Sequence, residues 1–323
     1  MFHRSAKISV TPLLLALMSL VAGSVAIAGT VGPTPGTTAQ VKTAVTASHK
    51  IKQLPALAAI QLATLGANHG DNPLRVGVPG TSCLLVTSCV YGNLSSKRTV
   101  VLFGDSHMWM WMPAIVPAVT KANFRLVLLE KFGCPASMLP TGFVFYDSVS
   151  PPDSGCSAFH TYAYSAVATL KPSLVVITER TAGIYSGTYP YNNQPAFTAK
   201  QWKSALVSTI NSFQSTTTKV VVLEDVPFLT QDPISCLSVH ASDVQKCSIP
   251  YPNPIFPGQQ SAQKDAATAT GAGFIKTVQW LCMTNCSAVV GKYVTHFDVG
   301  HISTTYAMFL SNVLAASLKP YLK

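Results

Sequence analysis

The sequence predicts an α/β protein built around a parallel β-sheet of about five strands. From residue 99 onward, short apolar runs rich in β-branched residues alternate with longer segments of helical periodicity. This alternation is typical of βαβ units with right-handed crossovers. The composition agrees, because 48% of the 323 residues are hydrophobic and only 11% are charged. Such a chain can bury a large core, which excludes a disordered protein.

The strands are expected to be short and the helices longer. The predicted strands are Val100–Phe103, Phe124–Leu129, Leu174–Thr178, Val220–Glu224 and Gly273–Val278. The predicted helices are Met108–Lys121, Phe159–Leu170, Phe197–Phe213, Gln259–Thr270 and Ser303–Leu318. The segments between some of these elements are long and rich in Pro and Ser, namely 135–155 and 226–257. Long loops at strand ends often select the substrate.

Residues 1–28 are typical of a secretory signal peptide. Two basic residues precede an apolar run from Ile8 to Val25, and Ala-Ile-Ala then offers a cleavage site before Gly29. The same segment could nearly span a bilayer as an uncleaved anchor. Pro12 and Gly23 interrupt the run and favour cleavage. We therefore expect an exported protein that is periplasmic, associated with the cell wall or secreted.

Three segments are expected after the signal peptide. Residues 29–48, rich in Gly, Pro, Thr and Ala, are predicted to be a flexible linker. Residues 49–98 are predicted to be an N-terminal extension that packs on the domain through a short helix. Residues 99–323 are predicted to form the α/β domain itself.

The chain is basic, with 22 Lys and Arg against 12 Asp and Glu and a formal net charge of +10. This charge supports solubility and could also attract anionic wall polymers. No basic run is interleaved with aromatic residues, so nucleic-acid binding is not expected.

Eight cysteines fall as four neighbouring pairs in the sequence. The pairs are Cys83 and Cys89, Cys134 and Cys156, Cys236 and Cys247, and Cys282 and Cys286. In an exported chain they are expected to be disulfides, and local pairing is the simplest of many possible connectivities. A zinc site is not expected, because the last pair lacks a second ligand pair at zinc spacing. Neither a metal nor a cofactor is expected.

A candidate nucleophile follows the first predicted strand. The strand ends in Gly104-Asp105-Ser106, and an apolar, aromatic segment follows. Ser106 would then lie at the carboxyl end of a strand and at a helix N-terminus, where backbone N–H groups can stabilise an oxyanion. The alternative role for Ser106 is a helix N-cap. Asp105 is expected to fix the turn.

A candidate base lies near the other end of the chain. Asp298 and His301 are three residues apart, just before a long apolar segment. A serine hydroxyl needs a base, and a carboxylate can orient that base. Asp298 could instead cap the helix that follows, and His301 could be a buried core histidine. His107 is the nearest rival base but should face another way on the helix, and His296 is expected to be a bystander.

These residues resemble the SGNH (GDSL-like) hydrolase superfamily. More narrowly, the chain is similar to the C-terminal SGNH domain of membrane-bound cell-envelope O-acyltransferases. The resemblance covers roughly residues 50–323 and does not include the multi-helix membrane module. The matching positions are Gly104–His107, Cys134-Pro135, Thr178–Arg180, Cys282 and Cys286, and Asp298–Ser303.

The resemblance implies an SGNH-hydrolase fold over residues 99–323, a three-layer α/β/α sandwich with a flavodoxin-like strand order, 2-1-3-4-5. It also supports local disulfide pairing. It implies a serine esterase or O-acyltransferase that cleaves or transfers O-acyl groups, acetyl above all, on a cell-envelope glycan. Ser106 would attack the ester, His301 would carry the proton, and Asp298 would orient His301. The implied partners are an O-acylated polysaccharide or glycolipid and a separate membrane acyltransferase module. The chain is expected to be a monomer.

The oxyanion hole departs from the family pattern. The Ser106 backbone N–H and Gly133 match two of the usual donors. The asparagine that the superfamily places after the third strand is absent, and Glu179-Arg180 stands there. Arg180 could polarise the carbonyl as a fixed cation, or it could form a salt bridge with Glu179 or Glu224. The missing asparagine favours the alternative of a non-catalytic, glycan-binding envelope protein, whereas retention of Ser, Asp and His disfavours it.

Overall fold

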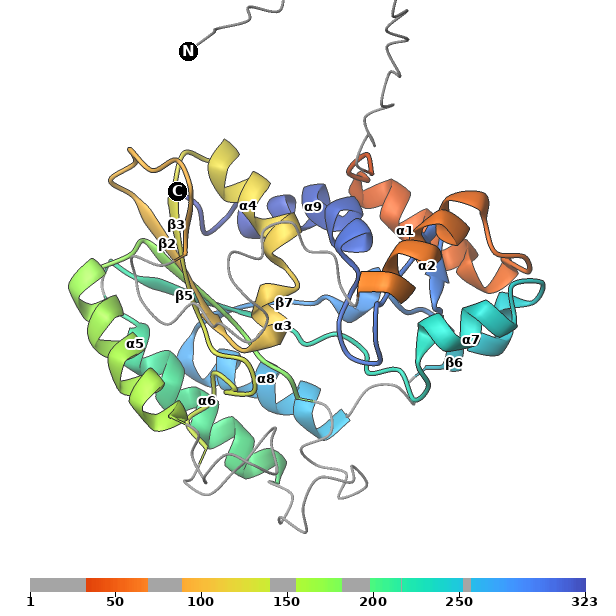
Figure 1. Cartoon of the computed structure of the whole chain (residues 1–323). Coiled ribbons are helices and arrows are strands. Elements are labelled where there is room, and N and C mark those ends of the chain that lie inside the picture. Colours follow the sequence, from red (N-terminus) through yellow and green to blue (C-terminus); the bar gives the residue numbers. More distant parts are fainter. Residues whose placement is uncertain (1–32, 69–88, 140–154, 182–197, 216, 252–256) are drawn as a thin grey trace, which may run out of the picture. The chain divides into compact units, whose positions relative to one another are not determined.

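A mixed β-sheet occupies the centre of the fold (Figure 1). The computed structural model describes residues 33–68, 89–139, 155–181, 198–215, 217–251 and 257–323, all within one unit, Gly32–Lys323. Among these residues the strand order of the sheet is β1-β3-β2-β4-β5-β7. The strands are β1 (Val90–Gly92), β2 (Thr99–Gly104), β3 (Arg125–Glu130), β4 (Leu174–Thr178), β5 (Lys219–Leu223) and β7 (Gly273–Ile275).

The predicted topology is confirmed. The predicted strands correspond to β2, β3, β4, β5 and β7, and neighbours among them pair in parallel. Their order across the sheet, by sequence, is 2-1-3-4-5. β1 was not predicted, because three residues are too few to show a period. It pairs antiparallel with β3 at the edge of the sheet.

Helices cover both faces of the sheet, which gives the three-layer arrangement. On one face α4 (Met112–Lys121) packs against α9 (Thr304–Leu318). The other face carries α5 (Cys156–Leu170), α6 (Ala199–Phe213) and α8 (Pro257–Thr270) (Figure 1).

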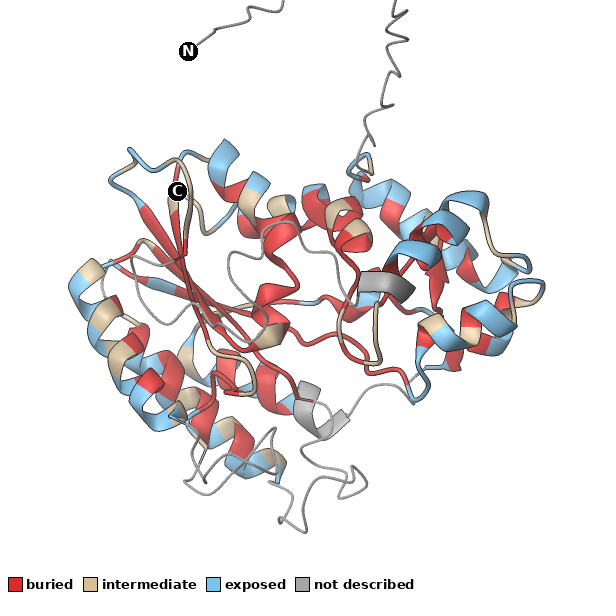
Figure 2. Cartoon of the chain, viewed as in Figure 1, coloured by how far each residue is buried: buried red, intermediate tan, exposed pale blue. Residues whose placement is uncertain are grey.

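The central strands are buried on both faces (Figure 2). Successive side chains of a strand point to opposite faces. Val100 and Leu102 therefore join the core that contains α4 and α9, while Val101 and Phe103 join the core that contains α5 and α6. A strand with two buried faces reads as a continuous apolar run, which is why β2 was recognisable from the sequence.

The helix predicted at Met108–Lys121 is two helices. α3 (Ser106–Trp109) is a single turn, and α4 begins at Met112. Pro113 lies in the first turn of α4. Proline has no backbone N–H to continue the helix from α3, but it is tolerated in a first turn.

The flexible linker predicted for residues 29–48 is wrong for its second half. Residues 38–47 form α1 (Thr38–Ala47), followed by the short 3₁₀ helix η1 (Ser48–Lys50). The Thr37 side chain caps α1, and the Gln40 side chain bonds back to the Thr37 backbone N–H. Val41 and Val45 are buried, and α1 packs on α9. The predicted signal peptide lies outside the described residues.

The second N-terminal helix also packs on the domain. α2 (Ala56–Asn68) starts directly after Pro55 and contacts β10 (Tyr293–Val294) and α7 (Pro233–Val239). The buried Gln61 side chain donates to the Val294 carbonyl and the Ser303 hydroxyl and accepts from the Val294 N–H. Among the described residues, no helix is both long enough and apolar enough to cross a bilayer.

Short elements lie between β5 and β7 and after β7. They are η2 (Val244–Cys247), β6 (Ile249–Pro250), η3 (Val278–Trp280), β8 (Asn285–Cys286) and β9 (Val289–Val290). The strand predicted for Gly273–Val278 ends early at Ile275. The backbone N–H groups of Thr277 and Val278 donate to the Glu224 carboxylate instead of continuing the ladder.

The cysteines pair locally where both partners are described. Disulfides join Cys134 to Cys156, Cys236 to Cys247 and Cys282 to Cys286, with Cα–Cα distances of 5.6, 5.8 and 4.2 Å. Cys89 is also disulfide-bonded, while its predicted partner Cys83 lies outside the described residues. The Cys134–Cys156 disulfide links the loop after β3 to the start of α5.

Candidate active site

The candidate nucleophile lies at the carboxyl edge of the sheet. Ser106 is the first residue of α3, and Asp105 caps this helix by accepting the His107 N–H at 2.9 Å. The turn depends on Gly104, because a Cβ atom there would lie 2.0 Å from the Thr178 carbonyl oxygen. Glycine therefore lets β2 approach β4 closely where the chain turns into α3.

The structure brings Ser106, His301 and Asp298 into one hydrogen-bonded line. His301 Nε2 lies 2.8 Å from Ser106 Oγ, and His301 Nδ1 lies 2.8 Å from Asp298 Oδ2. An ionised carboxylate only accepts hydrogen bonds, so Nδ1 carries the proton. The Nε2 lone pair then faces the serine hydroxyl, which is the arrangement a general base requires.

Asp298 also organises the loop that carries His301. Its Oδ1 accepts the backbone N–H groups of Gly300 at 2.8 Å and His301 at 2.7 Å. Burial acts to raise the pKa of Asp298, but His301 and these hydrogen bonds outweigh it and hold that pKa below its ordinary value. The carboxylate therefore stays ionised and continues to orient the imidazole.

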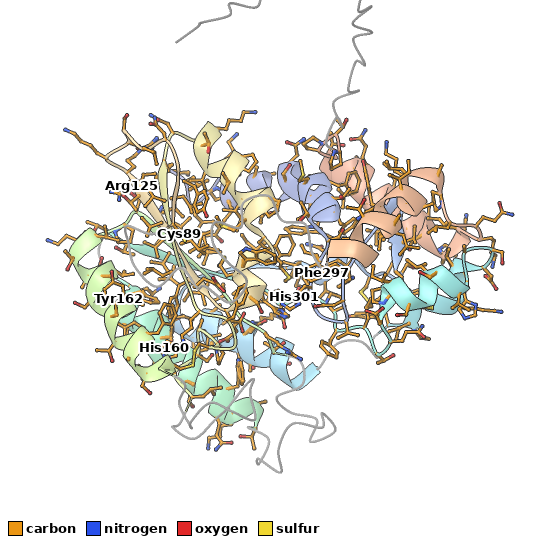
Figure 3. The ribbon with its side chains drawn as sticks, viewed as in Figure 1. Cys89, Arg125, His160, Tyr162, Phe297 and His301 are labelled. Carbon is orange, nitrogen blue, oxygen red and sulfur yellow. A yellow bond between two sulfur atoms is a disulfide. The ribbon has the colours of Figure 1, made fainter. Side chains whose placement is uncertain are left out.

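Two aromatic rings lie against the His301 ring. The Phe297 ring stacks on it with centroids 5.3 Å apart and planes 14° apart (Figure 3). The His107 ring lies 4.7 Å away at an angle of 57°. Trp109 packs edge-on against Phe297 at 6.5 Å. The stacked Phe297 ring restricts rotation of the candidate base.

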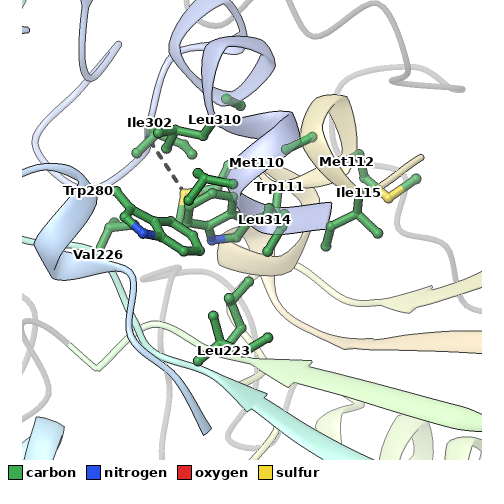
Figure 4. Packing of buried hydrophobic residues seen from close by; sticks show 14 of the residues in the cluster. Met110, Trp111, Met112, Ile115, Leu223, Val226, Trp280, Ile302, Leu310 and Leu314 are labelled. Atoms are coloured by element: carbon green, nitrogen blue, oxygen red, sulfur yellow. Dashed lines mark hydrogen bonds between the residues drawn. The ribbon is translucent and has the colours of Figure 1, made fainter. Parts of the chain in front are cut away.

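The buried core joins the two distant parts of the site. The Ile302 N–H, next to His301, donates to the sulfur of Met110 at 3.4 Å (Figure 4). Close by, the rings of Trp111 and Trp280 meet edge to face at 6.0 Å. Fully buried side chains of this size stabilise the fold by about 1.5–3 kcal/mol each. The core thus fixes residues Gly104–His107, here called the nucleophile turn after the candidate nucleophile Ser106, against the loop that carries the candidate base His301.

The rival histidines do not reach Ser106. His296 is buried, and its ring nitrogens lie 2.9 Å from the Thr295 hydroxyl and 3.2 Å from the Pro227 carbonyl. Burial lowers the pKa of His296 to about 4, so its ring is neutral near pH 7. His107 Nδ1 is bonded to Asp225 at 2.6 Å, and both side chains are almost wholly buried.

Sequence reasoning missed Asp225. Its Oδ1 accepts from His107 Nδ1 and the Val226 N–H, and its Oδ2 accepts from the N–H and hydroxyl of Thr181. Burial acts to raise the pKa of Asp225, but His107 and the hydrogen bonds lower it overall. The available signal was its place directly after the fourth predicted strand, at the edge where Ser106 also lies.

Arg180 lies at the same edge, after β4. Its backbone N–H donates to Asp105 Oδ2 at 3.0 Å, and its guanidinium carbon lies 5.3 Å from the centre of the Phe228 ring. In the described part of the chain, no ion pair joins it to Glu179 or Glu224. Gly133 lies in the loop after β3 with a φ of 73°, a conformation that glycine adopts without strain.

Glu179 ties the loop after β3 to the sheet. It accepts the N–H of Ser137 at 2.6 Å, the Ser137 hydroxyl at 2.7 Å and the Trp202 indole N–H at 3.0 Å. Burial raises the pKa of Glu179 to about 8, although these hydrogen bonds oppose the shift. Among the described residues, no group of three or more His, Cys, Asp or Glu side chains could hold a metal ion.

Most of the chain matches one known protein family. Residues 77–316 match the family model described as "SGNH domain (fused to AT3 domains)". Comparison with curated proteins gives no match.

Several solved structures are similar to this chain at low sequence identity. The lipopolysaccharide acetyltransferase periplasmic domain of Salmonella ser. Paratyphi A is 15% identical, with a TM-score of 0.54 over 70% of this chain and 85% of that one. A GDSL-like lipase from Bacteroides thetaiotaomicron is 17% identical, with a TM-score of 0.40 over 69% and 89%. The M. smegmatis aryl esterase is 16% identical, with a TM-score of 0.41 over 69% and 99%.

Proposed function

The chain belongs to the family of SGNH domains that are fused to AT3 domains, and from this premise we propose that it is an exported serine esterase or O-acyltransferase of cell-envelope glycans. Membership makes it an enzyme that acts on ester bonds, as a hydrolase or an acyltransferase. The observation that carries the finer proposal is the unbroken line of hydrogen bonds from Ser106 Oγ through His301 to Asp298.

The first half of the reaction transfers the acyl group to the enzyme. Ser106 Oγ attacks the acyl carbonyl while His301 Nε2 takes the hydroxyl proton. Asp298 stabilises the imidazolium that forms. When the tetrahedral intermediate collapses, the C–O bond to the sugar breaks and His301 returns the proton to the leaving oxygen. The acyl group is then an ester on Ser106.

The second half depends on the acceptor. His301 takes a proton from a water molecule or a sugar hydroxyl, whose oxygen attacks the acyl-enzyme. Water gives an esterase, and a sugar hydroxyl gives a transferase. In both cases the proton returns to Ser106 Oγ through His301 as the acyl–serine bond breaks.

The oxyanion is stabilised by groups at the carboxyl edge. The Ser106 N–H at the start of α3 is one donor, and the Gly133 N–H is a second. Arg180 takes the place of the missing asparagine as a fixed cation. Its support is its position after β4, where its backbone is bonded to the residue before Ser106.

The proposed substrate is an O-acetylated polysaccharide or glycolipid outside the cytoplasm. Support comes from the N-terminal sequence, from the family's association with AT3 domains and from the likeness to the periplasmic domain of a lipopolysaccharide acetyltransferase. A separate membrane module would deliver the acyl group if the enzyme is a transferase.

The test uses the mature, oxidised protein with an O-acetylated envelope polysaccharide. Proton NMR follows free acetate and the O-acetyl signals of the glycan, with and without an unacetylated acceptor glycan. We expect wild type to release or move acetyl groups and Ser106→Ala to do neither. Acetyl turnover by Ser106→Ala at the wild-type rate would refute the proposal.

A further inference from the structure

A second imidazole–carboxylate pair lies beside the proposed triad but takes no part in it. His107 follows Ser106 directly, and its ring donates to Asp225 rather than to the serine. Its Nε2 is buried and has no hydrogen-bond partner among the described residues. Ser106 Oγ is bonded to His301 instead. This pair is therefore not a second base for Ser106, and its buried position needs a different explanation.

The hydrogen bonds of Asp225 identify its protonation state. It accepts from His107 Nδ1, the Val226 N–H and the Thr181 N–H at 2.6, 2.8 and 2.7 Å. The Thr181 hydroxyl lies a further 2.8 Å from Oδ2. His107 and these hydrogen bonds hold the pKa of Asp225 below its ordinary value, so Asp225 is ionised and, as an acceptor only, takes the proton of His107 Nδ1.

The contacts of Asp225 connect three segments that the fold brings to one edge. His107 belongs to the nucleophile turn after β2, Thr181 follows β4, and Asp225 itself follows β5. Asp105 makes a parallel connection, because it accepts the N–H of His107 on one oxygen and the N–H of Arg180 on the other. The backbone at residues 180 and 181 is thus held to the nucleophile turn by two buried carboxylates.

We propose that Asp225, with His107 and Thr181, is a buried clamp that positions Arg180 beside Ser106. The inference rests on the proposed function, in which Arg180 replaces the missing asparagine donor. Asp225, His107 and Thr181 are positioning residues, since they act on the reaction through Arg180. Fixed donors stabilise an oxyanion without reorganisation, so a buried clamp on the segment that carries Arg180 would favour catalysis by fixing that donor.

A double-mutant cycle tests whether Asp225 acts through Arg180. The variants are Arg180→Ala, Asp225→Asn and the double variant, with kcat and KM measured on p-nitrophenyl acetate. Misplacing a catalytic group can cost roughly 10- to 100-fold, so Asp225→Asn should lower kcat/KM within that range, mainly through kcat. In the Arg180→Ala background the same substitution should have no further effect.

Threonine variants test the clamp even if Asp225→Asn does not fold. Thr181→Val is isosteric but removes the hydroxyl that binds Asp225, whereas Thr181→Ser keeps it. We expect Thr181→Val to lower kcat and Thr181→Ser to restore it. The matched control is Thr218→Val. This buried residue donates through its hydroxyl to the Pro172 carbonyl at 2.7 Å, at the opposite edge of the sheet. The Thr218→Val variant should lose about as much stability as Thr181→Val and keep the wild-type kcat.

The outcomes separate the clamp from the proposed function. Turnover that survives in Ser106→Ala refutes the proposed function. If turnover depends on Ser106 but the losses in Asp225→Asn and Arg180→Ala multiply in the double variant, the clamp is refuted and the function stands. A loss of kcat in Thr218→Val equal to that in Thr181→Val would also refute the clamp, because it would show a general effect of stability.

Discussion

At the scale of single residues, the proposed chemistry depends on which nitrogen of His301 carries the proton. Asp298 settles this, because an ionised carboxylate can only accept the Nδ1 proton. The same carboxylate accepts two backbone N–H groups of its own loop, so the imidazole and the loop are oriented together. Loss of the carboxylate should therefore affect orientation more than the presence of a base.

Variants of the three proposed triad residues should lose activity to different extents. Ser106→Ala and His301→Ala remove the proposed nucleophile and the proposed base, so kcat on p-nitrophenyl acetate should drop by about 10⁴-fold or more. Asp298→Asn keeps the base and should retain at least about tenfold more activity than His301→Ala. Steady-state kinetics on proteins of equal thermal stability provide the measurement. An Asp298→Asn enzyme as inactive as His301→Ala would contradict this order.

Arg180 should act through both its charge and its planar shape. Removing one oxyanion donor costs about 10²- to 10³-fold in kcat, and we expect Arg180→Ala to approach this range. Arg180→Lys keeps the charge but loses the planar fork, so its loss should be smaller. Thermal stability should stay unchanged in both. A drop in melting temperature that parallels the loss of activity would instead assign Arg180 a structural role.

At the scale of elements, the carboxyl ends of three neighbouring strands carry Ser106 and the groups around it, whereas Asp298 and His301 lie in the loop between β10 and α9. β2 leads to Ser106, β4 to Glu179 and Arg180, and β5 to Asp225. The apolar, β-branched strands were predictable because both of their faces are buried, and residues at their ends could be assigned to one edge. The partners of Glu179 and Asp225 were not predictable, because Ser137, Trp202 and Thr181 come from loops and helices whose packing leaves no periodic signal.

Glu179, which accepts hydrogen bonds from the loop after β3, should make the free energy of unfolding depend on pH. Its pKa is about 8 in the folded protein against an ordinary 4.5, so the fold binds the proton more tightly than the unfolded chain. That stabilisation is fully present below the ordinary value and is lost as the pH rises towards about 8. Glu179→Gln removes the titration. We expect the melting temperature of wild type to fall relative to Glu179→Gln over this interval, and parallel curves would contradict the assignment.

At two helix ends the sequence carries a local signal that the overall pattern of the segment concealed. The break between α3 and α4 follows from Pro113, which the apolar pattern of the predicted helix concealed. α1 was read as a linker from its composition, although Thr37 and Gln40 form a capping box at its start. Composition describes the average of a segment, whereas a cap and two buried valines are enough to order a short helix against a neighbour.

At the scale of the whole molecule, the site exists only in the folded chain. Ser106 and His301 are 195 positions apart, and the packing of α4 against α9 brings their segments together. The order Ser, Asp, His and the family resemblance made this meeting predictable. The sequence predicted a short helix in residues 49–98 that packs on the domain, but not α1 or the long-range contacts that hold α2, such as those of Gln61 with Val294 and Ser303.

The N-terminal helices should contribute to global stability. Leu65 on α2 is 1% exposed and Ile60 on the same helix is 66% exposed. Leu65→Ala should destabilise the protein by about 2–5 kcal/mol, as core truncations do. Ile60→Ala is the matched control and should change stability by less than about 0.5 kcal/mol. Denaturant unfolding measures both, and equal effects would show that α2 does not share the core of the domain.

The central claim is that Ser106 is a nucleophile activated by His301, and covalent labelling tests it most directly. The oxidised protein is treated with a fluorophosphonate probe, digested and analysed by peptide mass spectrometry. We predict one adduct, on Ser106, absent in Ser106→Ala and strongly slowed in His301→Ala. An adduct on another residue, or a folded protein whose Ser106 stays unlabelled, would contradict the account and favour a glycan-binding protein without catalysis.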